Sequence, residues 1–165
     1  MSVIYLHSLF PKAEIYALEP DPSNFRLLQK NVGSLERVHT YNIALSDKDG
    51  SDEFHIFPGR KTSASFHNRD SGGDVVQVET ITLGSFMKKA SLQKIDVLKF
   101  DIEGAEERIF VDIQKESAQI RYIIGEIHFD MISMDEKEVL PYFRAYETSV
   151  QYTSQKRAVI RAHRV

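Results

Sequence analysis

Apolar residues form two kinds of pattern along this chain, short continuous runs and repeats at helical spacing. The two patterns alternate. The run AEIYALE at 13–19 is rich in strand-forming residues and stops at Pro20, which predicts a strand. Asp21 then stands where it would cap a helix that begins at Pro22. Apolar residues at helical spacing follow at Phe25, Leu28, Val32 and Leu35. The chain therefore opens its repeating pattern with a strand, a turn and a helix.

The same alternation continues to the C-terminus. Apolar runs at 95–102 and 120–127 are typical of strands buried on both faces of a parallel sheet. Period-two patterns and turn residues predict further strands at 37–46, 52–57, 75–81, 148–154 and 157–165. Helices are predicted at 83–92 with a cap near Ser85, at 105–113, and at 134–146 with a break at Pro141. The polar stretch 58–74 has the length of a functional loop.

Strands that alternate with helices predict an α/β fold with an open, mostly parallel sheet that closes on an antiparallel C-terminal pair. The chain has 165 residues, 42% of them hydrophobic, which is enough for one sizeable core. Residues 1–165 are therefore expected to form a single domain. In open α/β sheets the ligand lies outside the carboxyl ends of the strands.

Composition narrows the classes of function. The formal net charge is −3 and the pI is near 6.1, so no general field draws nucleic acid to the surface. No stretch approaches the ~18 apolar residues of a membrane span. Neither nucleic acid nor a membrane is an expected partner. The absence of cysteine fits a cytoplasmic protein.

Acidic residues stand at the ends of the predicted strands, where a ligand would lie. Glu19 ends one strand, Asp101 and Glu103 end another, and Glu126 and His128 end the strand expected beside it. Adjacent strands lie about 4.8 Å apart, so Asp101 and Glu126 are expected to face each other across one crevice. The alternative is that each carboxylate is an ordinary helix cap or loop residue.

Two of these positions have a mechanical rationale. A carboxylate at the end of such a strand, here Glu19, can accept the hydrogens of both hydroxyls of a ribose. Gly104, in the sequence DIEGAE, permits a tight turn from strand to helix. The alternative for Gly104 is a plain turn residue.

The successive segments IYALEPDPSNFRLLQKNV, YNIALSDKDG, VETITLGSFM, IDVLKFDIEGAEERIF and IIGEIH resemble the signatures of the FkbM family of methyltransferases. The likeness covers about residues 3–130, and the order of the segments is as specific as their content. The resemblance implies a class I, Rossmann-like methyltransferase fold. It further implies methyl transfer from S-adenosylmethionine to a hydroxyl of a sugar, polyketide or related small molecule.

The resemblance also implies roles for individual residues. Glu19 would hold the ribose of S-adenosylmethionine. Its adenine would be lined by Ala44, Leu45, Ser46 and Asp47. Asp101 and Glu103 would lie near the methionine part of the cofactor or near the acceptor.

Two departures from the family pattern stand out. The family usually has an aspartate at the position of Gly84, so a capping or loop contact is expected to be missing there. The family's first strand and its glycine-rich loop, of the form DxGAxxG, should precede the helix that SVIYLHSLF resembles. The fold is therefore expected without this central strand, which would leave the neighbouring strand edges unpaired. Another copy of the chain or a partner is expected to complete the sheet, in preference to direct pairing of the two edges.

The chemistry of an O-methyltransferase needs a base that takes the proton of the acceptor hydroxyl. Asp101, Glu126 and His128 are the candidates, His128 because its ordinary pKa lies near neutral pH. A divalent metal on Asp101 and Glu126 has no evident third ligand, so no metal is expected.

Two other classes of function stay open. One is a non-catalytic domain that keeps the fold, has lost the cofactor loop and acts through a partner or an oligomer. The other is a nucleotide-dependent oxidoreductase, which Glu19 alone suggests. The absence of a GxGxxG motif disfavours the oxidoreductase.

Overall fold

The computed structural model describes residues 2–56 and 74–165. After α1 (Ser2–Leu9), the predicted order of strand, turn and helix is confirmed: β1 (Ile15–Leu18) leads into α2 (Pro22–Val32). The carboxylate of Asp21 caps α2 by accepting hydrogen bonds from the N–H groups of Ser23 and Asn24, at 2.6 and 3.2 Å. Because Pro22 takes the first helical position, α2 starts where the sequence predicts.

The predicted single strand at 37–46 is wrong, because the chain changes sheets in the middle of it. β2 (Val38–Tyr41) pairs in parallel with β1, whereas β3 (Ala44–Leu45) belongs to another sheet. Between them the side-chain amide of Asn42 donates hydrogen bonds to the carbonyls of Glu19 and Pro20, at 2.8 and 2.9 Å. These bonds turn the chain, so one ladder cannot continue through the segment.

The antiparallel pair predicted after it is confirmed. β4 (Gly50–Ile56) pairs with β5 (Asp74–Ile81), and β5 also pairs in parallel with β3. The loop predicted at 58–74 lies outside the described residues except for its last residue.

α3 (Leu83–Lys89) follows β5, and its cap lies near Ser85, as predicted. Thr82 is the cap, and its hydroxyl accepts the N–H of Ser85 at 3.3 Å. The N–H of Thr82 donates to Asp49 at 2.7 Å. The start of α3 is therefore capped although Gly84 stands where the family has an aspartate.

The C-terminal half follows the predicted order closely. β6 (Ile95–Phe100), α4 (Glu106–Lys115) and β7 (Ile120–His128) form a parallel crossover unit. The helix predicted at 134–146 is indeed broken, into α5 (Glu136–Val139) and a 3₁₀ turn, η1 (Leu140–Phe143). β8 (Tyr146–Ser154) and β9 (Arg157–Arg164) form the predicted antiparallel pair, with β9 between β7 and β8.

The prediction of one open, mostly parallel sheet needs correction. The described strands form separate sheets of order β1–β2, β3–β5–β4 and β6–β7–β9–β8. Among these strands three pairings are parallel and three are antiparallel. The physical reason is that no described strand lies between β1 and β6 to join their ladders, so the sheet is split at this place.

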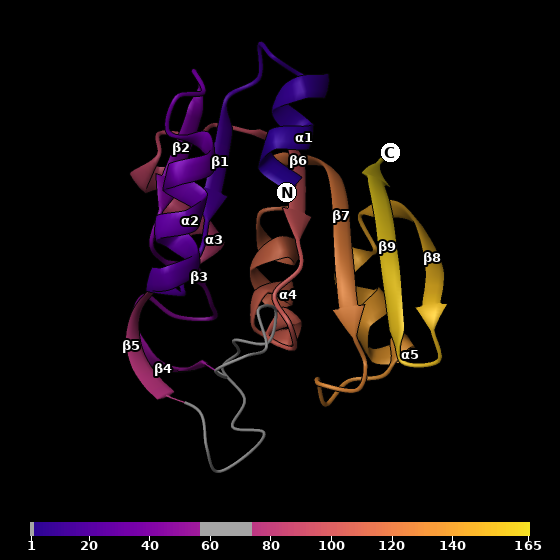
Figure 1. Ribbon diagram of the computed structural model, residues 1–165. Coiled ribbons are helices and arrows are strands. Elements are labelled where there is room, and N and C mark those ends of the chain that lie inside the picture. Colours follow the sequence, from indigo (N-terminus) through magenta and orange to yellow (C-terminus); the bar gives the residue numbers. More distant parts are fainter. Residues whose placement is uncertain (1, 57–73) are drawn as a thin grey trace.

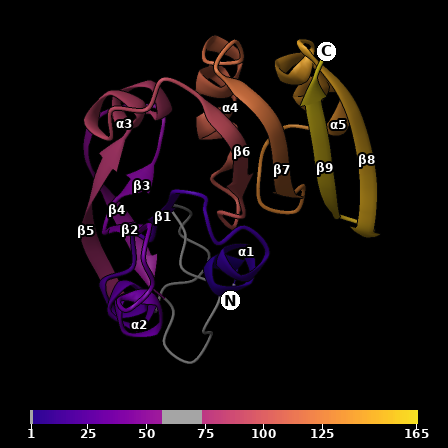
Figure 2. The ribbon, with the colours of Figure 1, turned by 90° about the horizontal axis from the view of Figure 1, so that it is seen from above.

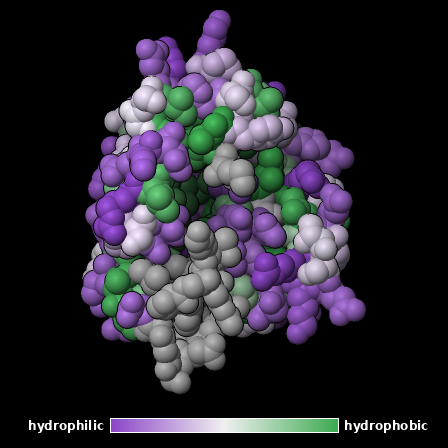
Figure 3. All heavy atoms as spheres, viewed as in Figure 1, coloured by the Kyte–Doolittle hydropathy of each residue, from purple (hydrophilic) through white to green (hydrophobic). Residues whose placement is uncertain are grey.

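The edges of β1 and β6 that face each other across the split have no backbone partner within the described chain, so the two strands have not closed up. Figure 1 shows β1 and β6 apart, with α1 in front of the space between them. The surface on this side is hollowed, and apolar side chains line the hollow (Figure 3). We refer to the separation of β1 from β6 as the gap.

Helices lie on both sides of the strand layer. Figure 2 shows α4 and α5 on one side of the four-stranded sheet and α1 on the opposite side. The face towards α4 holds the main core, which includes Phe110, Ile113 and Ile123. On the other face of β6 and β7, Val97, Tyr122 and Ile124 are 39 to 46% exposed. Among the described residues no helix is long and apolar enough to cross a membrane.

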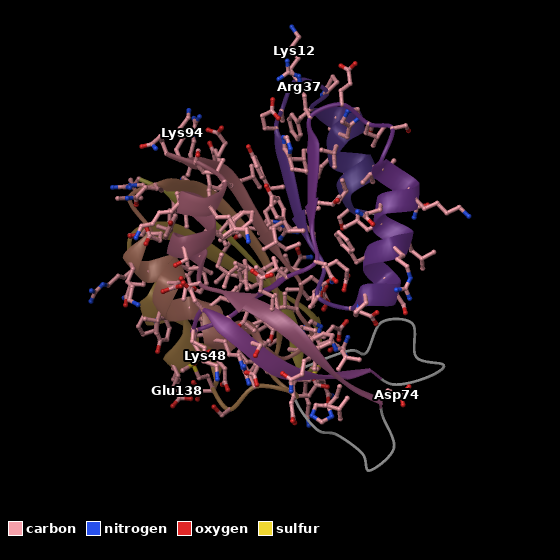
Figure 4. All side chains as sticks on the ribbon, turned by 90° about the vertical axis from the view of Figure 1, so that its left-hand side faces the viewer. Lys12, Arg37, Lys48, Asp74, Lys94 and Glu138 are labelled. Carbon is pink, nitrogen blue, oxygen red and sulfur yellow. The ribbon has the colours of Figure 1, made fainter. Side chains whose placement is uncertain are left out.

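Residues that precede the strands and residues that follow them lie at opposite ends of the molecule. Lys12 before β1 and Lys94 before β6 lie at one end, whereas Lys48 after β3 and Glu138 after β7 lie at the other (Figure 4). We call this second end, where the parallel strands finish, the rim. The predicted site residues lie in the last residues of β1, β3, β6 and β7 or directly after them, and they therefore belong to the rim.

Candidate active site

A tight turn carries the chain from β6 into α4 at the rim. Glu103 and Gly104 both have positive φ, at 48° and 92°. A Cβ on Gly104 would lie 2.6 Å from the Cβ of Met131, so both the conformation and the space require glycine. This confirms the turn predicted from DIEGAE, and the turn presents Asp101 and Glu103 together.

His128 ends β7 and lies at the centre of a cluster of acidic side chains. It is 1% exposed, and its Nδ1 lies 2.6 Å from Oε1 of Glu106. Its Nε2 faces Oε2 of Glu103 at 3.7 Å and Oδ1 of Asp101 at 4.0 Å. Ligand atoms of Asp101, Glu103 and His128 all lie within 4.8 Å of one another. We call these three residues together with Glu106 the rim cluster.

Glu106 is the residue of this cluster that sequence reasoning missed. It is fully buried at the first position of α4, and its Oε1 also accepts the N–H of Gly104 at 3.1 Å. Since a carboxylate only accepts, the bond to His128 fixes the ring with its Nδ1–H towards Glu106. The other oxygen of Glu106, Oε2, is buried without a hydrogen-bond partner in the described chain. The sequence offers only a glutamate in the first turn of the helix that follows DIEGA, which is too common to serve as a signal.

The cluster shifts the protonation of its members. Burial lowers the pKa of His128. The hydrogen bond and charge of Glu106, together with the charge of Glu103, raise this pKa by more than burial lowers it, so the net shift is upward. Burial also raises the pKa of Glu103, helped by the charge of Asp101 and opposed by His128. The cluster therefore favours the protonated forms of His128 and Glu103.

Asp101 and Glu126, predicted to face each other at the ends of β6 and β7, do not form one group of side chains in the described structure. Asp101 is exposed at the mouth of the cluster, with 40% of its side chain accessible. Glu126 is half-buried and pairs across the ladder with Val159 of β9. Among the described residues it is not part of the group of close ligand atoms, so the partner of Asp101 is His128 rather than Glu126.

Glu19 ends β1 on the other side of the gap. It is half-buried, and its Oε1 accepts the N–H of Asp21 at 3.0 Å. Burial raises its pKa, and the neighbouring Asp21 charge adds to this while the hydrogen bond opposes it. Its second carboxylate oxygen makes no hydrogen bond within the described chain. Glu19 therefore keeps the acceptor capacity that a ribose diol needs.

The segment predicted to line an adenine continues the rim. Ala44 is buried and Leu45 half-buried, and both pair with the end of β5. Ser46 is fully buried, and its hydroxyl donates to the exposed Asp47 at 3.0 Å. Because Ala44 and Ser46 are buried, Leu45 and Asp47 are the members of this segment with accessible side chains, and the adenine site stays a prediction.

A surface pocket of about 500 Å³ lies between the loop after β7 and the β8–β9 turn. Phe129 and Tyr152 line it with stacked rings, 6.1 Å between centroids. The hydroxyl of Tyr152 donates to Glu136, which also lines the pocket. None of the predicted cofactor residues lines this pocket. Phe129 directly follows His128, so the pocket adjoins the end of β7.

An α/β fold with acidic residues where its parallel strands end is typical of proteins that bind a small molecule at that edge of the sheet. The particular family is given by comparison. The chain matches the Methyltransferase FkbM domain over residues 2–150. It therefore belongs to the FkbM methyltransferase family, whose members generally use S-adenosylmethionine.

The individual relatives share about a quarter of their aligned residues with this chain. The chain is similar to the 2-O-methyltransferase NoeI of Sinorhizobium fredii, 26% identical over 136 residues, which cover 72% of this chain and 55% of NoeI. It is similar to the hexuronic acid methyltransferase AglP of Haloferax volcanii, 24% identical over 147 residues, 88% of this chain and 59% of AglP. The chain thus spans little more than half the length of these relatives. No solved structure gives a significant match.

Proposed function

We propose that this protein methylates a hydroxyl group of a sugar-type small molecule, with S-adenosylmethionine as the methyl donor. The observation that carries the proposal is the rim cluster, which gathers Asp101, Glu103 and His128 at the ends of β6 and β7 in a chain of the FkbM family. The names of two relatives support the acceptor class, since one is a 2-O-methyltransferase and the other acts on a hexuronic acid.

The described residues fit the adenosine part of the cofactor. Glu19 offers a half-buried carboxylate with unused acceptor capacity, which suits the two ribose hydroxyls. Ala44, Leu45, Ser46 and Asp47 would line the adenine. S-adenosylmethionine supplies an activated methyl group when bound. The residues of the chain supply position and proton transfer.

Asp101 is the most exposed group of the rim cluster and can touch an acceptor. It is exposed, whereas His128 and Glu106 are buried behind it. A carboxylate placed beside the acceptor hydroxyl takes its proton as the oxygen becomes a nucleophile. His128, held by Glu106, adds a positive charge or a further proton acceptor behind Asp101, and holding the groups together lowers the cost of orienting them.

The pocket beside β7 has a lining that suits a sugar. Stacked Phe129 and Tyr152 offer an apolar face to the C–H groups of a ring, and Glu136 offers hydrogen-bond acceptors to hydroxyls. Because this pocket adjoins the end of β7, an acceptor that it holds would lie on the same rim as Asp101.

The gap between β1 and β6 supports a second candidate function, a non-catalytic domain, and it suggests that a further polypeptide strand binds there. The unpaired edges of β1 and β6 would suit a domain that works only with another polypeptide strand between them, whether from the rest of the protein or from a second copy. In the enzyme this strand completes the site. In a non-catalytic domain of the same fold the gap itself would be the binding surface, and S-adenosylmethionine would not be turned over.

Kinetics on two carboxylate variants test the proposed function. We expect Asp101→Ala to lower methyl transfer by at least 100-fold with little change in cofactor affinity, because general-base catalysis contributes about 10² to 10⁴. We expect Glu19→Ala chiefly to weaken cofactor binding. Asp96→Ala, at the opposite end of β6, and Glu14→Ala, just before β1, are the matched controls. Unchanged turnover in Asp101→Ala would remove this residue from the site.

A further inference from the structure

We propose that the rim cluster is a divalent-cation site, with Asp101, Glu103 and Nε2 of His128 as its protein ligands and Glu106 as the residue that orients His128. The proposal deepens the proposed function, since the ion would lie where the acceptor hydroxyl is expected. Only the catalytic role of the ion rests on the proposed function, because the binding of the ion needs neither cofactor nor acceptor.

The first argument is the orientation of a buried imidazole. His128 is 1% exposed, and its Nδ1 is engaged by Oε1 of Glu106 at 2.6 Å. A metal-binding histidine typically donates its other N–H to a carboxylate, which fixes the tautomer and makes the ligating nitrogen more basic. In neutral His128, with Nδ1–H turned to Glu106, Nε2 carries the lone pair. This nitrogen points to the two carboxylates and makes no hydrogen bond within the described chain.

The second argument is the spacing of the donor atoms. Nε2 lies 3.7 Å from Glu103 and 4.0 Å from Asp101, and all three ligand atoms fall within 4.8 Å. These separations are too long for hydrogen bonds. Donors that are each ~2.1 Å from one octahedral ion lie ~3.0 to ~4.2 Å apart, so only small side-chain movements would close the shell.

The third argument is charge. Three carboxylates surround one imidazole, so the cluster carries a formal charge of −3 with neutral His128 and −2 with protonated His128. Glu106 is fully buried and its Oε2 lacks a partner, which is costly for a charged group. Arg157 acts on the cluster from a distance, but it pairs with Asp130 at 3.9 Å. A divalent ion would balance the charge that these groups leave.

The donor set indicates which ion to use as a probe. Two carboxylates with one imidazole suit Mn²⁺ or Zn²⁺, whereas Ca²⁺ and Mg²⁺ prefer oxygen ligands alone. Asp101 is exposed, so water or acceptor oxygens could complete the shell from its side. A hydroxyl bound to such an ion loses its proton more easily.

Titration with Mn²⁺, followed by the electron paramagnetic resonance signal of free Mn²⁺, tests the proposal in the absence of S-adenosylmethionine. We expect the wild-type chain to remove one equivalent of Mn²⁺ from solution and Zn²⁺ to displace it. Asp101→Asn and Glu103→Gln should each weaken binding at least tenfold. Glu106 is not a proposed ligand, but Glu106→Gln should weaken Mn²⁺ binding by about 10 to 100-fold because it disturbs the orientation of His128.

Asp96→Asn is the matched control, because it removes a carboxylate from the other end of β6 and should leave Mn²⁺ binding unchanged. Circular dichroism establishes that each variant is folded. No binding by folded wild-type protein at millimolar Mn²⁺ would overturn the proposal, as would equal binding by wild type and Asp101→Asn. Either result leaves the methyltransferase proposal standing, since that is measured with S-adenosylmethionine.

Discussion

Gly125 shows how tightly single residues fix the strand pair that carries the rim cluster. It lies opposite Phe100 in the β6–β7 register, and a Cβ at this position would meet Cζ of the Phe100 ring at 2.1 Å. Since the ring is part of the buried core, it cannot swing away freely. A side chain at position 125 would therefore push against the strand pair that carries Asp101 and His128 at its end.

We therefore expect Gly125→Ala to destabilise the protein by at least ~1 to 3 kcal/mol, the usual cost of overpacking a core. Gly84→Ala is the matched control. Its Cβ would meet only the flexible end of Glu116, at 2.6 Å, and alanine favours a helix by up to ~1 kcal/mol. Denaturant unfolding should show a lower midpoint for Gly125→Ala alone. Equal midpoints for the two variants would contradict this account of the packing.

At the same scale, part of the candidate site could be predicted and part could not. Asp101, Glu103 and His128 follow apolar strands, so their place at one rim was predictable from the pattern of the chain. Glu106 was not, because a glutamate in the first turn of a helix is ordinary, and only the fold shows it buried against His128. Glu126 was expected to face Asp101, but the position of a side chain at a strand end depends on the turn that follows.

At the scale of elements, an ion pair connects the β3–β5–β4 sheet to α4, the helix that begins at Glu106 of the rim cluster. Arg108 of α4 donates to Asp52 of β4 at 2.8 Å, with about a quarter of each side chain exposed. Its hydrogen bond lowers the pKa of Asp52 more than burial raises it. Because a lowered carboxyl pKa means that folding favours the ionised form, this stabilisation is present above the unfolded pKa of about 3.9. It is lost as the pH falls through the lower, folded pKa.

We expect Asp52→Asn to cost about 0.5 to 1 kcal/mol at neutral pH, the range of partly exposed ion pairs. The difference from wild type should shrink as the solution is acidified below about pH 4. Thermal unfolding of both proteins at several pH values measures this. The neighbouring Glu53→Gln serves as the control. A loss of stability in Asp52→Asn that is as large in acid as at neutral pH would show that the ion pair is not its cause.

Element types were predictable where the hydrophobic period was clear, as in 95–102 and 120–127. The errors arose where side chains intervene. Asn42 divides the segment 37–46, which was predicted as one strand, by bonding to the carbonyls that follow β1, and the cap of α3 is Thr82, three residues before Ser85. Both are side-chain to backbone hydrogen bonds, whose effect on the chain depends on tertiary neighbours that a sequence pattern does not contain.

At the scale of the whole molecule, the gap divides the proposed cofactor site. Glu19 and the segment at 44–47 lie on one side of it, and the rim cluster lies on the other. The methionine carboxylate of the cofactor needs N–H donors, such as those of a loop at the start of a helix. If this charge stays unpaired in a crevice, the cost is several kcal/mol, and each ~1.4 kcal/mol is a tenfold loss of affinity. A strand and loop in the gap would provide these donors.

The most direct test of the account is a calorimetric titration with S-adenosylmethionine of two proteins, the 165-residue chain and a version with about 20 further residues before Met1 that can form a strand and loop. We predict weak or no binding by the first and micromolar binding by the second, which Glu19→Ala should weaken at least tenfold. Micromolar binding by the 165-residue chain as a monomer would contradict the role given to the gap. Absence of binding by the longer protein would contradict the proposed function itself.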